Sequence, residues 1–144
     1  MERVYVSTTL GAGLATTWAA LGDFHHWPAW TPRLRTSVAE GGSGVGSVRV
    51  LTLEPDGRQV RERLVHHDPA DHRFSYEFDG VNPYPVAAYR GTVHLLPITD
   101  TGTTFLEWFG DFDAEPGLVH DLRGRFTAVY AAFAGDLRAY LAAL

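Results

Sequence analysis

The sharpest candidates for chemistry are two charged residues, Arg49 and Glu62, which lie in segments of otherwise apolar alternation. A carboxylate on an apolar face can take a proton from a carbon acid or return one during a dehydration. An arginine beside it can polarise a carbonyl group or hold a carboxylate. The alternative is a buried ion pair that satisfies only itself, because structural ion pairs also occupy apolar surfaces. The residue types leave both interpretations open.

A hairpin brings these two residues together. Asp56-Gly57 is the strongest short signal for a two-residue turn, here over Pro55–Arg58. The opposed pairs that this turn predicts are Leu53 with Val60, Leu51 with Glu62, and Arg49 with Leu64. Residues two apart share one side of a strand, so all six lie on one face. Arg49 and Glu62 then become diagonal neighbours, a separation that long side chains can bridge.

Tyrosines and other bulky residues recur at positions that the same alternation places inside. The hydroxyl of Tyr89 could donate a hydrogen bond to a carbonyl or enolate oxygen, and Tyr76 and Tyr130 carry the same group. The further residues expected to contact a ligand are Trp30, Leu51, Leu64, Trp108, Phe112, Phe126 and Phe133. The alternative is that these side chains simply fill the core.

The seven histidines form no recognisable metal motif. His25-His26 and His66-His67 are adjacent pairs, whose members point to opposite sides of an extended chain. No HExxH motif accompanies them, so we expect no metal ion, and we expect these pairs and His72 to face solvent. The chain has no cysteine and its basic residues are all arginine, which excludes disulfides, thiolate chemistry and lysine Schiff bases.

Length and charge restrict the class of protein. A chain of 144 residues favours one domain, spanning 1–144. The formal net charge of −5 argues against a nucleic-acid-binding protein. The longest apolar run, Ala128–Ala134, is far too short to span a bilayer, and the N-terminus has no signal-peptide pattern. We therefore expect a cytoplasmic protein that binds neither nucleic acid nor membrane.

The elements that position these residues follow from apolar periodicity. Strands are expected at Arg3–Thr9, from about Leu34, on both sides of Asp56-Gly57, and at Arg73–Phe78, Val86–Ile98 and Thr104–Phe112. Leu14–Leu21 predicts a short helix, and Asp23–Pro32 predicts a further helical turn that two prolines limit. Gly117–Leu144 predicts an amphipathic helix about 40 Å long, in which Gly124 and Gly135 suggest a bend or a close approach.

This order of elements indicates a two-layer α+β domain, with an antiparallel sheet whose apolar face is covered by one long helix. A long helix laid across a strongly curved sheet can leave space between the two layers. Such a space is a natural pocket for a small molecule.

The segments TTWAALGDFHHWPAWTP, GVGSVRV, RERL, HRFSYEF, AYRGTV and TTFLEWFGDF, taken in this order, resemble a known superfamily. It is the START-like, helix-grip superfamily called SRPBCC, and within it the polyketide cyclase/dehydrase branch. The resemblance covers nearly the whole chain. It implies a curved antiparallel sheet wrapped around a long C-terminal helix, with two short helices after the first strand. It also implies an internal cavity for a hydrophobic or amphipathic ligand, lined by Glu62, Tyr89 and Trp108.

The branch contains cyclases and aromatases of secondary metabolism, but also carriers and receptors, so several functions stay open. The first hypothesis is a cyclase or dehydratase that needs no cofactor and acts on a polyketide-like molecule. Glu62 would be its acid or base, and Arg49 and Tyr89 would orient carbonyl oxygens. The second is a carrier that binds such a molecule without chemistry. The third is a homodimeric regulatory module that uses Gly80–Tyr89 as a lid.

Overall fold

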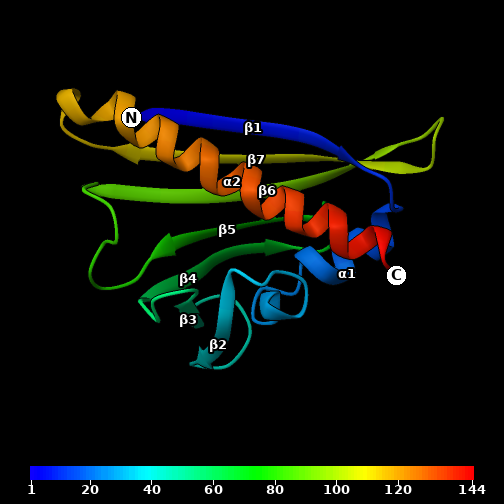
Figure 1. The fold of residues 1–144 in the computed structure, drawn as a ribbon, viewed down its shortest axis with the longest axis horizontal. Coiled ribbons are helices and arrows are strands. Elements are labelled where there is room, and N and C mark those ends of the chain that lie inside the picture. Colours follow the sequence, from blue (N-terminus) through cyan, green and yellow to red (C-terminus); the bar gives the residue numbers. More distant parts are fainter.

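The computed structural model describes residues 1–144 and contains one seven-stranded antiparallel sheet crossed by one long helix (Figure 1). The strands are β1 (Glu2–Leu10), β2 (Leu34–Glu40), β3 (Val48–Leu53), β4 (Gln59–Asp68), β5 (Arg73–Phe78), β6 (Ala88–Ile98) and β7 (Thr103–Asp113). The helices are α1 (Leu14–Leu21) and α2 (Val119–Ala142), with 3-10 turns η1 (Trp27–Ala29) and η2 (Pro116–Leu118). The strand order is β1-β7-β6-β5-β4-β3-β2, and the predicted α+β helix-grip fold is confirmed.

The long helix α2 forms because apolar residues recur every three or four positions along it. The buried residues of this stripe are Leu122, Phe126, Tyr130, Ala134, Leu137 and Leu141. The helix packs against β1, whereas the sheet bends away from it toward β2 (Figure 1). Neither Gly124 nor Gly135 has another atom close to the position of an added Cβ, so the close approach expected at these glycines is absent.

The β3–β4 hairpin has a different register from the predicted one. The amide of Leu53 donates to the carbonyl oxygen of Arg58, 2.8 Å away, so the loop contains four residues, Glu54–Gly57, rather than two. Arg49 therefore pairs directly with Glu62 instead of lying diagonally from it. Because the register differs by two residues, every side chain keeps its side of the sheet, and the predicted inner face is confirmed.

The corner between α1 and β2 buries more residues than the sequence indicated. Trp27 begins η1, is almost completely buried, and donates its indole N–H to a backbone carbonyl oxygen of α1 at 3.0 Å. His25, which the sequence predicts in solvent, is buried instead. Its Nε2 atom lies 2.8 Å from the Oγ atom of Ser47, just before β3. His26 is exposed, as predicted, and its Nδ1 atom lies 2.7 Å from a carboxylate oxygen of Asp23.

Two further histidines are less exposed than predicted. His67 and His72 pack against the ring of Trp18, with centroid separations of 5.4 and 5.5 Å, because α1 lies over this end of the sheet. Of His66, His67 and His72, only His66 is exposed. Nowhere do three histidine, aspartate or glutamate side chains gather in a way that could hold a metal ion. None of the helices combines the length and the apolar character that crossing a membrane requires.

The packing of α2 on the sheet can be tested at Leu137, which is fully buried. We expect Leu137→Ala to lower the free energy of unfolding by about 2–5 kcal/mol, because it removes apolar contacts and leaves a cavity. Leu144→Ala is the matched control, since Leu144 is 72% exposed and its truncation should change stability by less than about 0.5 kcal/mol. Urea unfolding followed by circular dichroism measures both. Equal effects of the two substitutions would contradict this packing.

Candidate active site in the cavity

A cavity of about 520 Å³ lies between α2 and the strands β3 and β4. Sixteen of the 22 residues that line it are hydrophobic, so it suits a ligand with an apolar body. Helix α2 contributes Phe126, Val129, Tyr130 and Phe133, while β3 and β4 contribute Leu51, Leu53, Val60 and Glu62. The space exists because the sheet bends away from α2 on the side of β2.

Most residues that the sequence predicted for the site line this cavity. They are Arg49, Leu51, Glu62, Tyr76, Tyr89, Trp108, Phe126, Tyr130 and Phe133. Trp30, Leu64 and Phe112 are buried but do not line it, and their contact with a ligand stays a prediction. Two of them, Trp30 and Phe112, pack against aromatic residues that line the cavity. The Phe112 ring centroid is 5.3 Å from that of Phe126, and the Trp30 centroid is 6.2 Å from that of Phe133.

Trp27, which was not among the predicted ligand contacts, lines the cavity. Its ring lies 5.1 Å from that of Trp30 and 5.5 Å from that of Trp108, centroid to centroid. Trp27 begins the 3-10 turn η1 and Trp30 follows it directly. The direction of this turn depends on contacts with the rest of the fold. The spacing of the two tryptophans identified an aromatic corner, and it could not show which indole faces inward.

Arg49 is buried in the lining of the cavity and contacts a carboxylate, a backbone carbonyl oxygen and two aromatic rings. Its Nη2 and Nε atoms lie 2.7 and 2.9 Å from Oε1 of Glu62, and Nη1 donates to the carbonyl oxygen of Phe24 at 2.8 Å. The guanidinium carbon lies 3.8 Å from the ring centroid of Phe24 and 3.9 Å from that of Trp27. Since Nε and Nη1 donate to protein oxygens and Nη2 lies in the ion pair with Glu62, this arrangement favours a supporting role for Arg49 over the predicted contact with a carbonyl group of the ligand.

Glu62 keeps one carboxylate oxygen for a ligand. Oε1 accepts the hydrogen bond from Nε of Arg49 and lies 2.7 Å from its Nη2 atom, whereas Oε2 accepts no hydrogen bond from the protein. The side chain lines the cavity and is only 8% exposed. The ion pair thus fixes the position of the carboxylate, and the second oxygen is free to accept a proton or a hydrogen bond.

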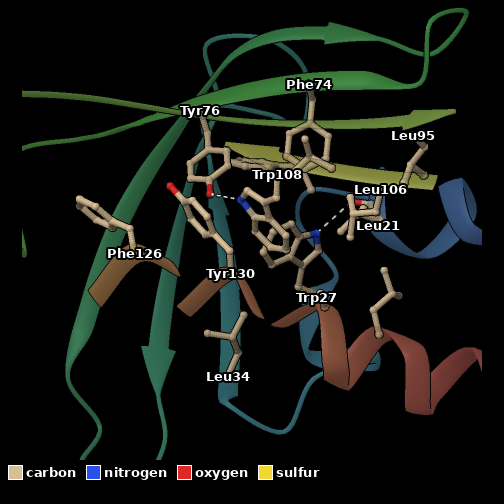
Figure 2. Close-up of a cluster of buried hydrophobic side chains, with 14 of the residues drawn as sticks. Leu21, Trp27, Leu34, Phe74, Tyr76, Leu95, Leu106, Trp108, Phe126 and Tyr130 are labelled. Atoms are coloured by element: carbon tan, nitrogen blue, oxygen red, sulfur yellow. Dashed lines mark hydrogen bonds between the residues drawn. The ribbon is translucent and has the colours of Figure 1, made fainter. Parts of the chain in front are cut away.

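Three tyrosine hydroxyl groups gather beside this carboxylate on the sheet side of the cavity. The indole N–H of Trp108 donates to the hydroxyl oxygen of Tyr76 at 3.1 Å (Figure 2), and the hydroxyls of Tyr89 and Tyr130 are hydrogen-bonded to each other. Burial raises the pKa of all three phenols, and the negative charge of Glu62 raises that of Tyr76 further. At neutral pH these phenols are therefore uncharged hydrogen-bond donors.

Two glycines make room for these hydroxyls. Gly91 of β6 and Gly110 of β7 face each other in the ladder. A Cβ atom at Gly110 would clash with the hydroxyl oxygen of Tyr130, and one at Gly91 would clash with the ring carbon that carries the hydroxyl of Tyr76. Gly110 lies on the buried face of β7, and nothing in the sequence indicates which side chain occupies the space above it.

Comparison with known proteins gives both a family and a fold. The whole chain, residues 1–144, matches a family described as polyketide cyclase/dehydrase and lipid transport. A protein from Nitrosospira multiformis is 27% identical, with a TM-score of 0.80 over 96% of this chain and 94% of that one. XoxI from Bacillus cereus is 25% identical, with a TM-score of 0.86 over 98% and 96% of the two chains.

The same fold extends to proteins of lower sequence identity. Norcoclaurine synthase from Thalictrum flavum, solved in complex with dopamine and hydroxybenzaldehyde, is 17% identical. Its TM-score is 0.77 over 97% of this chain and 86% of that one. No curated protein matches this chain by sequence.

The fit between Gly110 and Tyr130 yields a rescue experiment. We expect Gly110→Ala to lower the free energy of unfolding by about 1–3 kcal/mol, because the new methyl group overlaps the Tyr130 hydroxyl. Adding Tyr130→Phe should restore part of that loss, since it removes the atom in the way. Gly124→Ala, on the exposed side of α2, should leave stability unchanged or raise it by up to about 1 kcal/mol. Strictly additive losses in the double variant would contradict the contact.

The buried phenols predict a loss of stability in alkali. The pKa values of Tyr76, Tyr89 and Tyr130 are raised in the folded protein, so above a pH of about 10 the unfolded chain binds fewer protons than the folded chain. Their contribution is complete below that pH and is lost as the pH rises further. Urea unfolding between pH ~8 and ~11 measures the effect, and Tyr130→Phe should make the decline shallower. A stability that stays flat over this range would contradict the burial of these groups.

Proposed function

Because this chain belongs to the polyketide cyclase/dehydrase and lipid transport family, we propose that it binds a small, polyketide-like molecule and catalyses its cyclisation or dehydration without a cofactor. Family membership confirms the resemblance found in the sequence and indicates hydrophobic ligand binding as the general role. The observation that carries the finer proposal is the free carboxylate oxygen of Glu62, which faces an apolar cavity beside three uncharged phenols.

The cavity has the size and surface for such a ligand. Its volume of about 520 Å³ falls within the range of small-molecule sites, which is roughly 300–1,000 Å³. Flat aromatic surfaces dominate the walls, and the rings of Trp108 and Tyr130 are stacked at 5.3 Å with an interplanar angle of 13°. A folded chain of ketone groups or a planar aromatic product would pack against these walls. The polar groups of such a ligand would meet the tyrosine hydroxyls and Glu62.

The reaction begins with proton transfer from the ligand to Glu62. A carbon between two carbonyl groups gives its proton to Oε2, the C–H bond breaks, and its electron pair moves into an enolate. A tyrosine hydroxyl donates a hydrogen bond to the enolate oxygen, where the negative charge develops. The enolate carbon then attacks a second carbonyl carbon and closes the ring. The electron pair of that C=O bond moves to its oxygen, which takes the proton back from Glu62 and becomes a hydroxyl group. In a dehydration, Glu62 returns the proton to the departing hydroxyl group, which leaves as water.

Arg49 supports this step through Glu62 rather than through the ligand. It binds Oε1 and leaves Oε2 without a protein partner, so the base has one fixed position in the lining of the cavity. Phe24 and Trp27 hold the guanidinium in turn, since their rings lie within 3.9 Å of its central carbon. Arg49 is therefore a positioning residue in this proposal.

A carrier without catalysis is the second candidate, and one observation favours it. Arg49 is paired with Glu62 and donates to the carbonyl oxygen of Phe24, so protein groups compensate its charge without any ligand. A carrier would use the same cavity and the same apolar walls. It would differ only in releasing its ligand unchanged.

Turnover of poly-β-ketone and hydroxy-ketone substrates distinguishes an enzyme from a carrier. We expect Glu62→Gln to lower turnover by roughly 10²–10⁴-fold while ligand affinity changes by less than about threefold, because the amide keeps the shape but cannot take the proton. Tyr89→Phe should lower turnover by about 100-fold through weaker stabilisation of the enolate. Glu77→Gln is the control, because Glu77 is paired with Arg90 at 2.9 Å and lies outside the cavity.

Binding must be measured beside product formation. If the wild-type protein binds these ketones and releases them unchanged, the carrier hypothesis replaces the enzyme. If the wild-type protein forms product and Glu62→Gln forms it equally fast, Glu62 is not the base. If no such ketone binds, the proposed class of ligand is wrong.

A further inference from the structure

The charged residues that line the cavity are paired with opposite charges, with one exception at its mouth. The five are Arg33, Arg49, Glu54, Arg58 and Glu62. Arg33 pairs with Asp136 at 2.8 Å, Glu54 pairs with Arg35, and Arg49 pairs with Glu62. Arg58 is exposed at the end of the β3–β4 loop and forms no ion pair. In a chain of net charge −5, an arginine left without an acid beside an apolar cavity calls for an anionic partner.

A second unpaired arginine stands at the same mouth. The guanidinium carbon of Arg125, on α2, lies 4.8 Å from the ring centroid of Tyr84, and this arginine also forms no ion pair. Tyr84 lines the cavity and packs on Phe126 with a centroid separation of 4.7 Å. Burial raises the pKa of the Tyr84 phenol, while the positive charges of Arg125 and Arg58 oppose that rise. Arg125 therefore lies over the ring of Tyr84, and Arg58 lines the same cavity as Tyr84.

From this juxtaposition we propose that the ligand is amphipathic and carries a carboxylate, which Arg58 and Arg125 bind at the mouth while the apolar body fills the cavity. The inference rests on the proposed function, because it assigns the end of the same ligand. A guanidinium presents two parallel N–H donors that match the two oxygens of a carboxylate. The interior offers no alternative cation, because Arg49 is bound to Glu62. The Tyr84 hydroxyl is a further hydrogen-bond donor in the lining of the same cavity.

The orientation of the ligand follows from this anchor. With the carboxylate at the mouth, the opposite end of the ligand lies deepest, next to Glu62 and the hydroxyls of Tyr76 and Tyr130. The reacting carbonyl groups would then be distant from the acid end. The mouth arginines set direction and affinity, and they take no part in the proton transfer.

Matched pairs of acid and neutral compounds test the anchor. The probes are 2-naphthoate with its methyl ester, and dodecanoate with dodecanol, titrated into the full chain by calorimetry. We expect the acids to bind more tightly than their neutral partners, and Arg58→Gln or Arg125→Gln to weaken each acid about fivefold. The double variant should weaken the acids by more than about tenfold, and the neutral compounds should change by less than twofold. Higher salt should weaken only the acids.

Arg90→Gln is the matched control, because Arg90 is an exposed arginine of β6 that pairs with Glu77 outside the cavity. It should leave every affinity unchanged. Unchanged binding of the neutral compounds also shows that each variant is folded. If acids and neutral compounds bind equally and the double variant does not alter their ratio, the anchor is wrong although the cavity binds ligand. If none of the four probes binds, the proposed ligand binding and this inference both fail.

Discussion

The buried guanidinium of Arg49 is the constraint on which the site depends. A buried charge costs several kcal/mol unless it is paired and hydrogen-bonded. Arg49 meets this requirement with Glu62 across the hairpin, with the carbonyl oxygen of Phe24, and with the rings of Phe24 and Trp27. Three parts of the chain, namely β3, β4 and the corner after α1, are therefore held in one arrangement. A change in any of them would leave a charge unpaired inside the protein.

The cavity follows from how the two layers meet. Helix α2 packs on β1, and the sheet curves away from it toward β2 (Figure 1). The space left between α2 and the strands β3 and β4 is the cavity. The tyrosine hydroxyls occupy the opposite side, where Gly91 and Gly110 leave the sheet without side chains. Native cores are close-packed, so a space of this size is a built feature of the fold rather than a packing fault.

Polar groups inside this apolar space differ in the chemistry they offer. Burial holds the phenols of Tyr76, Tyr89 and Tyr130 in their protonated form, so they can donate hydrogen bonds but cannot act as bases at neutral pH. Glu62 supplies a free carboxylate oxygen beside them. Donors for a developing oxyanion and an acceptor for a proton thus share one cavity, while the unpaired arginines lie at its mouth. In the proposed function, proton transfer takes place in the interior and the entrance orients the ligand.

Local patterns along the chain were sufficient to predict the elements, the buried faces of the sheet and the charged pair on the apolar face. Alternation and helical spacing record which side of each element is buried. They were insufficient for the hairpin register, which depends on a hydrogen bond between Leu53 and Arg58 that closes a longer loop. Nor could they show that Trp27 rather than Trp30 faces the cavity, or that Gly110 lies under Tyr130. Such facts join residues far apart in the chain. Only the packing of α2 and the corner on the sheet decides them.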